Sequence, residues 1–149
     1  MDLLLWRHCH ALDGVPDDAR ALSPRGVKEA ASITRRLAPR LPAACRVVVS
    51  PALRAQQTAQ ALNRPFDTVA TVGTGASVAS VLRAAHWPHA PHTVLVVGHQ
   101  PTLGRVASLL LEGHERDRPM RAGEVLWITG GESESVPTVL TETIVPDPA

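Results

Sequence analysis

Short, nearly continuous apolar runs are the feature that most constrains the fold of this chain. Leu3–Trp6, Arg46–Val49 and Thr93–Val97 have the length and composition of strands that are buried on both faces of a sheet. Two further segments, Val125–Thr129 and Val139–Ile144, predict a pair of strands near the end of the chain. Strands of this kind are typical of a sheet that is covered by helices.

Helical segments alternate with these runs. Ser23 and Pro24 have the residue types of an N-cap and a first helical turn, and this helix is expected to end near Pro39. One face of it, expected to be the apolar one, carries Val27, Ala30, Ala31 and Thr34. Three more helices are predicted over Leu53–Leu62, Val78–Ala85 and Pro101–Leu111, and a short strand over Thr68–Val72. The alternation predicts an α/β fold: a three-layer sandwich with a mainly parallel central sheet and helices on both faces.

Length, charge and aromatic content narrow the choice of partners. A chain of 149 residues without repeats or long linkers is expected to form one domain, residues 1–149. The net charge is +1 and aromatic residues make up 3%, so no nucleic-acid partner is expected. No segment approaches the roughly 18 apolar residues of a membrane span. The N-terminal apolar run is too short for a signal peptide, so a cytoplasmic protein without a membrane partner is expected.

Residues suited to phosphate chemistry follow three of the predicted strands. Arg7 and His8 follow the first run, Arg54 comes soon after the second, and Gly98 with His99 follow the third. Ligands of such sheets bind at the carboxyl ends of the strands. These side chains are therefore expected to converge at one edge of the sheet.

Two histidines among several arginines suit the transfer of a phosphoryl group. Arg presents a planar fork of donors that matches phosphate oxygens, and a neutral imidazole is a nucleophile near pH 7. A second His can donate to the oxygens on which charge develops. Arg20, in the loop after the first strand, can fold over the same edge. The carboxylates are scattered along the sequence, so neither a metal nor a cofactor is expected.

The ordered motifs resemble those of the histidine phosphatase (phosphoglycerate mutase-like) superfamily. The segment Arg7–Cys9 corresponds to the family's opening Arg-His-Gly, and Val97–Pro101 to its later Gly-His element. Between them lie further family elements, namely Leu22-Ser23 with Gly26, and Val49–Pro51 with Leu53–Ala55 and Thr58. The short chain, the segment Asp18–Leu22 and the lack of an insertion for a substrate cap are most similar to the compact SixA-type phosphohistidine phosphatase branch.

This resemblance implies a role for each candidate residue. His8 is expected to accept the phosphoryl group, Arg7, Arg54 and His99 to complete the phosphate pocket, and Arg20 to add a further contact. The resemblance thus implies an enzyme, a histidine phosphatase that works without metal through a phosphohistidine intermediate.

The general acid of the larger relatives has no clear counterpart. It follows their second helix, where residues 63–85 of this chain contain only Asp67, which comes too early; the compact branch lacks this acid as well. Asp18 is a candidate substitute. A general acid contributes about 10²–10⁴-fold to a difficult proton transfer. A site without one is better matched to phosphohistidine, whose imidazole is a good leaving group.

Three functions fit these residues. The first is hydrolysis of phosphohistidine on a protein, and the second is hydrolysis of a small phosphorylated metabolite by a phosphomonoesterase. The third is a phosphate-binding module with weak turnover, tolerated because Cys9 replaces the family's Gly. The partner is accordingly a phosphorylated protein or a small phosphorylated substrate. Beside two His and several Arg, the thiol of Cys9 is expected either to narrow the pocket or to have a lowered pKa that makes activity redox-sensitive.

Overall fold

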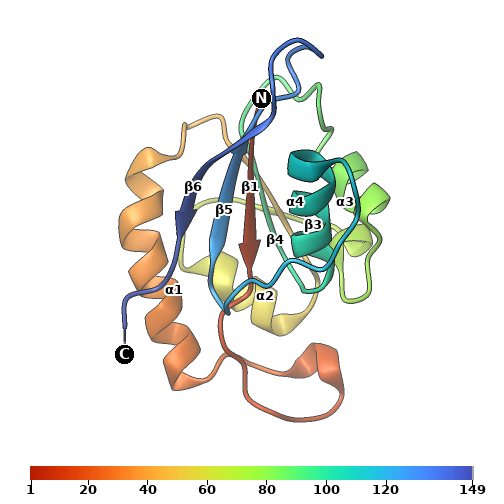
Figure 1. Ribbon diagram of the computed structural model, residues 1–149. Coiled ribbons are helices and arrows are strands. Elements are labelled where there is room, and N and C mark those ends of the chain that lie inside the picture. Colours follow the sequence, from red (N-terminus) through yellow and green to blue (C-terminus); the bar gives the residue numbers. More distant parts are fainter. Residues whose placement is uncertain (149) are drawn as a thin grey trace.

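A computed structural model describes residues 1–148 and contains a six-stranded sheet between two layers of helices (Figure 1). In spatial order the strands are β3 (Asp67–Thr68), β2 (Arg46–Val49), β4 (Val94–Gly98), β1 (Asp2–Arg7), β5 (Val125–Thr129) and β6 (Val139–Ile144). The first four are parallel, whereas β5 is antiparallel to β1 and β6 is antiparallel to β5. The predicted sandwich with a mainly parallel sheet is therefore confirmed.

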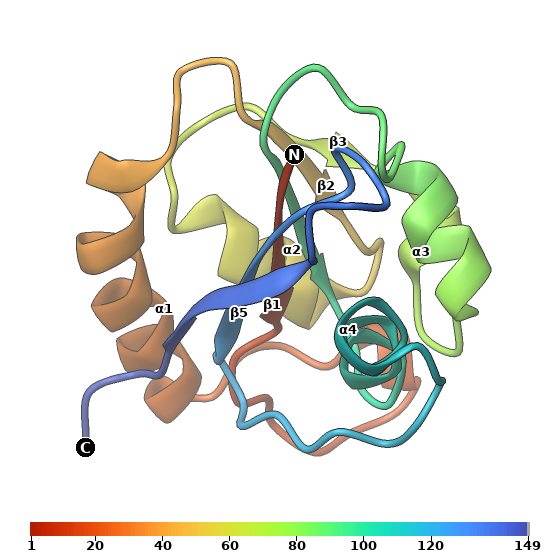
Figure 2. The ribbon, with the colours of Figure 1, turned by 45° about the horizontal axis from the view of Figure 1, so that its top comes forward.

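Four α-helices cover the two faces of this sheet. They are α1 (Pro24–Leu37), α2 (Leu53–Gln60), α3 (Val78–Ala84) and α4 (Thr102–Glu112), and short 3-10 turns lie at Asp17–Ala19, Ala38–Arg40 and Ala70–Val72. Figure 2 shows α1 and α2 on one side of the strands and α3 and α4 on the other. No helix among residues 1–148 combines the length and apolar character needed to cross a bilayer.

Each face of the sheet has its own core. Successive residues of a strand point to opposite faces, and in β1 this rule divides the apolar run between the two cores. Leu4 and Trp6 belong to the cluster that includes α1 and α2, whereas Leu3 and Leu5 belong to the cluster that includes α3 and α4. All four side chains are fully buried, which explains why the run is continuously apolar.

The parallel register sets which residues leave the sheet side by side. Arg7 of β1 is paired with Gly98 of β4, and Val49 of β2 with Val97. The backbone N–H of His8 extends this ladder by donating to the carbonyl oxygen of Gly98 at 3.0 Å. The residues after these three strands therefore begin at one level, at the carboxyl edge of the sheet.

The strand expected over Thr68–Val72 is shorter and begins earlier in the chain. Val48 and Val49 of β2 pair with Asp67 and Thr68, and there β2 ends. Because no partner extends further, the backbone after Thr68 forms a 3-10 turn instead of a longer strand.

The apolar face expected for α1 coincides only in part with the face that packs. Val27 is 58% exposed and Ala31 is also exposed, whereas Ala30, Ile33 and Leu37 are buried. Gly26 explains this rotation of the helix, because a Cβ on it would lie 2.0 Å from the carbonyl oxygen of His10. The start of α1 is thereby pressed against the loop that follows β1.

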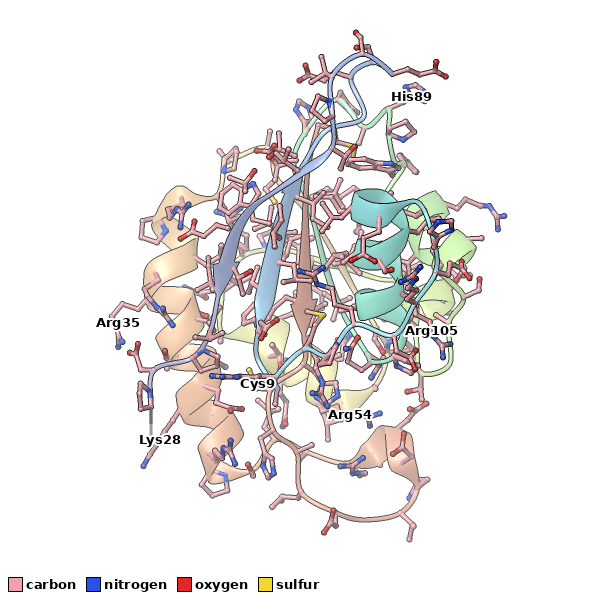
Figure 3. The ribbon with its side chains drawn as sticks, viewed as in Figure 1. Cys9, Lys28, Arg35, Arg54, His89 and Arg105 are labelled. Atoms are coloured by element: carbon pink, nitrogen blue, oxygen red, sulfur yellow. The ribbon has the colours of Figure 1, made fainter. Side chains whose placement is uncertain are left out.

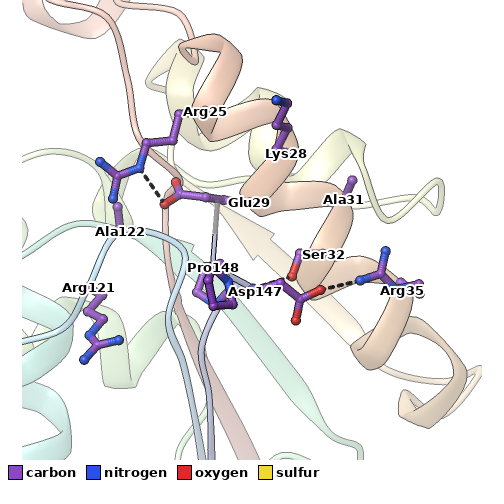
Figure 4. A pocket seen from close by; sticks show the side chains of 11 residues that line it. Arg25, Lys28, Glu29, Ala31, Ser32, Arg35, Arg121, Ala122, Asp147 and Pro148 are labelled. Carbon is purple, nitrogen blue, oxygen red and sulfur yellow. Dashed lines mark hydrogen bonds and ion pairs between the residues drawn. The ribbon is translucent and has the colours of Figure 1, made fainter.

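The C-terminal tail packs along α1 and leaves a hollow beside it. This hollow of about 730 Å³ is lined by α1, by residues 121–122 and by the tail (Figure 4). Asp147 pairs with Arg35, and Glu29 lies 3.5 Å from the Nε of Arg25. Glu29 also accepts the backbone N–H of His10 at 2.8 Å, so its buried carboxylate ties α1 to the loop after β1.

We predict that Gly26→Ala destabilises the protein although Ala favours a helix. Helix propensity alone would add about 1 kcal/mol, but overpacking against a backbone atom that cannot swing away costs about 3 kcal/mol. The free energy of unfolding, measured with urea, is therefore expected to fall by about 2 kcal/mol.

Gly98→Ala is the matched control, because a Cβ there would lie 3.5 Å from Leu103, an ordinary contact. Its unfolding free energy is expected to change by less than about 1 kcal/mol. Equal stability of the Gly26→Ala protein and the wild type would show that α1 can move away from His10.

Candidate functional site

Two histidines and two arginines meet at the carboxyl edge of the sheet. Arg7 ends β1 and His8 follows it, Arg54 lies in the first turn of α2, and His99 follows β4. The ring centroids of His8 and His99 are 5.2 Å apart, and the Nη2 of Arg54 is 3.5 Å from the Nδ1 of His99. Figure 3 shows Arg54 and Cys9 at this end of the strands. The structure thus brings together the four side chains that the sequence singles out.

His8 is held in one tautomer by the backbone of its neighbour. Its Nδ1 lies 2.8 Å from the carbonyl oxygen of Cys9. Because a carbonyl only accepts, Nδ1 must carry the proton, and the lone pair is left on Nε2. Burial lowers the pKa of His8 to about 4, with smaller contributions from His99, Arg54 and Arg7 in the same direction. The imidazole is therefore neutral near pH 7, the form in which Nε2 is a nucleophile.

His99 is fixed by Ser50 and Arg54. Its Nε2 lies 2.7 Å from the Oγ of Ser50, which in turn accepts the N–H of Ala52 at 3.1 Å. Arg54 can only donate, so its contact with Nδ1 leaves the ring proton on Nε2, directed at Ser50. Burial, and then the charge of Arg54, lower the pKa of His99 to about 4. In this arrangement the side of the ring that faces Arg54 carries no proton.

The guanidinium groups of Arg7 and Arg54 each have one N–H donor without a hydrogen-bond partner among residues 1–148. The Nη1 of Arg7 donates to the carbonyl oxygen of Met120 at 2.5 Å, and Arg54, only 4% exposed, donates through Nη1 and Nη2. The Nε atoms of both residues are buried and have no hydrogen-bond partner within residues 1–148. Unpaired buried donors are costly, and two of them on neighbouring cations suit the oxygens of an anion.

The other two candidate residues lie in the loop after β1 and meet different partners. Arg20 donates to the carbonyl oxygen of Leu12 at 2.8 Å and to Asp17 at 3.0 Å. Asp18 accepts the hydroxyl of Thr74 at 3.0 Å. In the described part of the chain, neither side chain forms a hydrogen bond or an ion pair with His8 or His99.

Asp17 is the site residue that sequence reasoning missed. Its carboxylate accepts hydrogen bonds from Arg20 and, at 3.0 Å, from Arg54, and its carbonyl oxygen accepts a second bond from Arg54 at 2.8 Å. The bonds from Arg20 and Arg54 hold the pKa of Asp17 below its usual value. The two consecutive aspartates just before Arg20 were the available signal, and only the fold shows which of them contacts Arg54.

Cys9 corrects one expectation from the sequence. Its side chain is fully buried, and burial raises the pKa of the thiol to about 12, so the expected low pKa is wrong. The neighbouring His8 is neutral and hence does not stabilise a thiolate. Its backbone N–H donates to the Oγ1 of Thr58 at 3.0 Å, and its φ is not positive. Nothing in this backbone requires the family's glycine.

Metal-ligating side chains do not gather in the part of the chain that is described. Within residues 1–148, no group of three or more His, Cys, Asp or Glu is placed to hold a metal ion.

Known proteins share this sequence pattern and this fold. The family model described as Histidine phosphatase superfamily (branch 1) matches residues 3–77. The proposed phosphohistidine phosphatase SixA from Nakamurella multipartitia has a TM-score of 0.77 at 30% identity, and the match covers 97% of this chain and 95% of that one. The protein histidine phosphatase SixA complexed with tungstate has a TM-score of 0.77 at 25% identity, with 98% and 97% covered.

A curated relative matches the sequence over part of its length. An uncharacterized protein of Mycobacterium tuberculosis is 34% identical over 103 residues, which are 66% of this chain. The chain spans 63% of the length of that relative.

We predict that the two buried histidines make stability depend on pH. Their pKa is about 4 in the folded protein and about 6.5 in the unfolded chain. Between these values the unfolded chain binds more protons, so the free energy of unfolding falls as the pH is lowered from about 6.5 to about 4. Above about pH 7 the two histidines no longer contribute to the pH dependence of the free energy of unfolding.

Urea unfolding at pH 7, 6 and 5 measures this slope. His8→Gln and His99→Gln should each reduce it, because each removes one buried imidazole. His92→Gln is the control for the substitution itself, since His92 is exposed at the opposite edge of the sheet. An identical slope in the wild type and both site variants would refute the burial of neutral imidazoles.

Proposed function

The chain belongs to the histidine phosphatase superfamily, and from its site we propose that it hydrolyses phosphohistidine on a protein through a covalent intermediate on His8. One observation carries the proposal: the proton of His8 is held on Nδ1 by the carbonyl oxygen of Cys9, which leaves the Nε2 lone pair free. The unpaired Nε–H groups of Arg7 and Arg54 supply donors for the phosphoryl oxygens.

In the first step, the lone pair of His8 Nε2 forms a bond to phosphorus. The bond between phosphorus and the imidazole of the substrate breaks, its electron pair leaves with that imidazole, and a proton comes from solvent. Arg7 and Arg54 stabilise the charge that spreads over the phosphoryl oxygens. In the second step a water oxygen attacks phosphorus, the electron pair returns to Nε2, one proton goes to solvent, and inorganic phosphate leaves.

The state of the nearby carboxylates favours phosphohistidine over an alkyl phosphate. The carboxylate of Asp17 accepts hydrogen bonds from Arg20 and Arg54, and these bonds hold the pKa of Asp17 below its usual value. Asp17 is therefore a poor proton donor. Alkyl phosphates have poor leaving groups and gain from a general acid, whereas imidazole leaves readily once protonated. A relative named as a protein histidine phosphatase, with 25% identity, supports the same substrate class for this chain.

A small phosphorylated metabolite is the second candidate substrate, and Asp18 is the observation that favours it. Asp18 is exposed, and its carboxylate accepts a hydrogen bond from the hydroxyl of Thr74. It also lies close enough to His99 for its charge to act on that ring. A carboxyl group in that place is available to protonate an ester oxygen. Asp18→Asn therefore separates the candidates: it should slow ester hydrolysis and leave phosphohistidine hydrolysis unchanged.

We predict phosphate release that resists a chelator and depends on His8. The substrates are free phosphohistidine, a protein chemically phosphorylated on histidine, and para-nitrophenyl phosphate, each incubated with EDTA. His8→Ala should abolish release, because no nucleophile remains, and brief reaction of the wild type with the phosphoprotein should leave acid-labile phosphate on the enzyme. Preference for para-nitrophenyl phosphate that is lost in Asp18→Asn would favour the metabolite enzyme, and binding without release would favour the binding module.

We also predict that tungstate binds to this edge and that Arg54→Lys weakens it. Lysine keeps the charge but loses the buried Nε–H and the planar fork. A hydrogen bond to a charged group contributes about 1.5–3 kcal/mol, so the dissociation constant should rise about 10- to 100-fold. Calorimetric titration measures it, with Arg105→Lys as control because Arg105 pairs with Asp117 on the surface. Equal affinity in all three proteins would place the oxyanion elsewhere.

A further inference from the structure

We propose that Asp17 positions Arg54 for the phosphoryl group and that Arg20 acts through Asp17 without touching the phosphoryl group. The inference rests on the proposed function in one respect: Arg54 has to be a phosphoryl contact. It changes the part expected of Arg20, which the family resemblance makes a direct ligand of the substrate.

The first step of the argument is how Arg54 is held. Its Nη1 donates to the carbonyl oxygen of Asp17 at 2.8 Å, and its Nη2 donates to the carboxylate of Asp17 at 3.0 Å. The hydroxyl of Thr74 accepts a longer bond from Nη2 at 3.3 Å. Both terminal nitrogens are therefore anchored, while the buried Nε–H stays unpaired. Because the long Arg side chain has many rotamers, this anchor decides where Nε points.

The second step is how Asp17 is held. The other oxygen of its carboxylate accepts from the Nη1 of Arg20 at 3.0 Å. The Nε of Arg20 donates to the carbonyl oxygen of Leu12 at 2.8 Å, and the N–H of Leu12 donates to the carbonyl oxygen of Ala21 at 2.8 Å. Arg20 thus closes the loop on itself and fixes the 3-10 turn that contains Asp17. Two of its three guanidinium nitrogens are engaged within this loop.

The third step concerns the sign of the effect. A carboxylate beside the site repels a phosphoryl dianion, so removing it should not weaken substrate binding. The same change frees the guanidinium of Arg54, and a displacement of about 1 Å can cost as much as 10²-fold in rate. Loss of Asp17 should therefore lower kcat about 10- to 100-fold and leave KM unchanged or lower. An ordinary loss of substrate affinity would move KM in the opposite direction.

Steady-state kinetics with phosphohistidine tests this on four proteins: wild type, Asp17→Ala, Arg20→Gln and the double variant. If Arg20 acts through Asp17, Arg20→Gln lowers kcat in the wild type and has no further effect in Asp17→Ala. Asp17→Asn should recover part of kcat, because its amide oxygen can still accept from Arg54. Asp13→Asn is the matched control, since it removes one exposed carboxylate from the same loop without contacting Arg54.

Three outcomes overturn the proposal. The first is a kcat for Asp17→Ala equal to or above the wild-type value. The second is a kcat decrease in the double variant that is the product of the two single decreases. The third is a kcat decrease in Asp13→Asn as large as that in Asp17→Ala. The second of these would make Arg20 an independent, direct contact. Melting temperatures within about 2 °C of wild type exclude unfolding as the cause of slower turnover.

A readout without turnover keeps this inference separate from the proposed function. If the wild type releases no phosphate from any substrate, the proposed function fails. The Nε–H signal of Arg54, assigned by its loss in Arg54→Lys, then reports on positioning by NMR. Exchange broadening of that signal in Asp17→Ala, with the wild-type signal sharp, is the expected result; an unchanged signal overturns the proposal.

Discussion

The parallel pairing of β1 with β4 is the interaction on which the candidate site depends. Arg7 lies opposite Gly98, and the ladder continues one bond further, from the N–H of His8 to the carbonyl oxygen of Gly98. This bond fixes the level at which both histidines leave the sheet. A one-residue shift in the register of β1 against β4 would turn the buried side chains of β1 to the opposite core. It would also separate the rings of His8 and His99. The apolar strands therefore hold the chemistry in place as well as the fold.

Burial lowers the pKa of both kinds of basic side chain at this edge, but only the histidines lose their protons. Each histidine has a pKa of about 4, whereas the guanidinium of Arg7 keeps its charge because its ordinary pKa is so high. The site thus places two neutral imidazoles beside guanidinium cations. Asp17 compensates part of that positive charge from the solvent side, where water screens its carboxylate. On the buried side, the Nε–H groups of Arg7 and Arg54 have no hydrogen-bond partner among residues 1–148.

Sequence reasoning went furthest where a residue's position follows directly from its strand. The strands from β1 to β6, apart from the short β3, and the four helices follow from periodicity and from punctuation by Ser and Pro. The placement of Arg7, His8 and His99 follows from the strand ends. Other features depend on packing and could not be predicted from the sequence. Gly26 sets the rotation of α1, and burial raises the pKa of the Cys9 thiol. The role of Asp17 could not be predicted, because which of the two neighbouring aspartates contacts Arg54 depends on the conformation of a turn that Arg20 fixes.

The contact between His8 and the carbonyl oxygen of Cys9 also fixes the chemical identity of the proposed intermediate. With the proton retained on Nδ1, phosphorus is joined to the nitrogen remote from the main chain, so a single regioisomer forms, the tele isomer. The phosphorylated ring is then an imidazolium, which departs from phosphorus more easily than a neutral ring does. In the proposed mechanism this one main-chain oxygen favours a short-lived phosphoenzyme, and because the oxygen belongs to the backbone, Cys or Gly at position 9 can supply it equally.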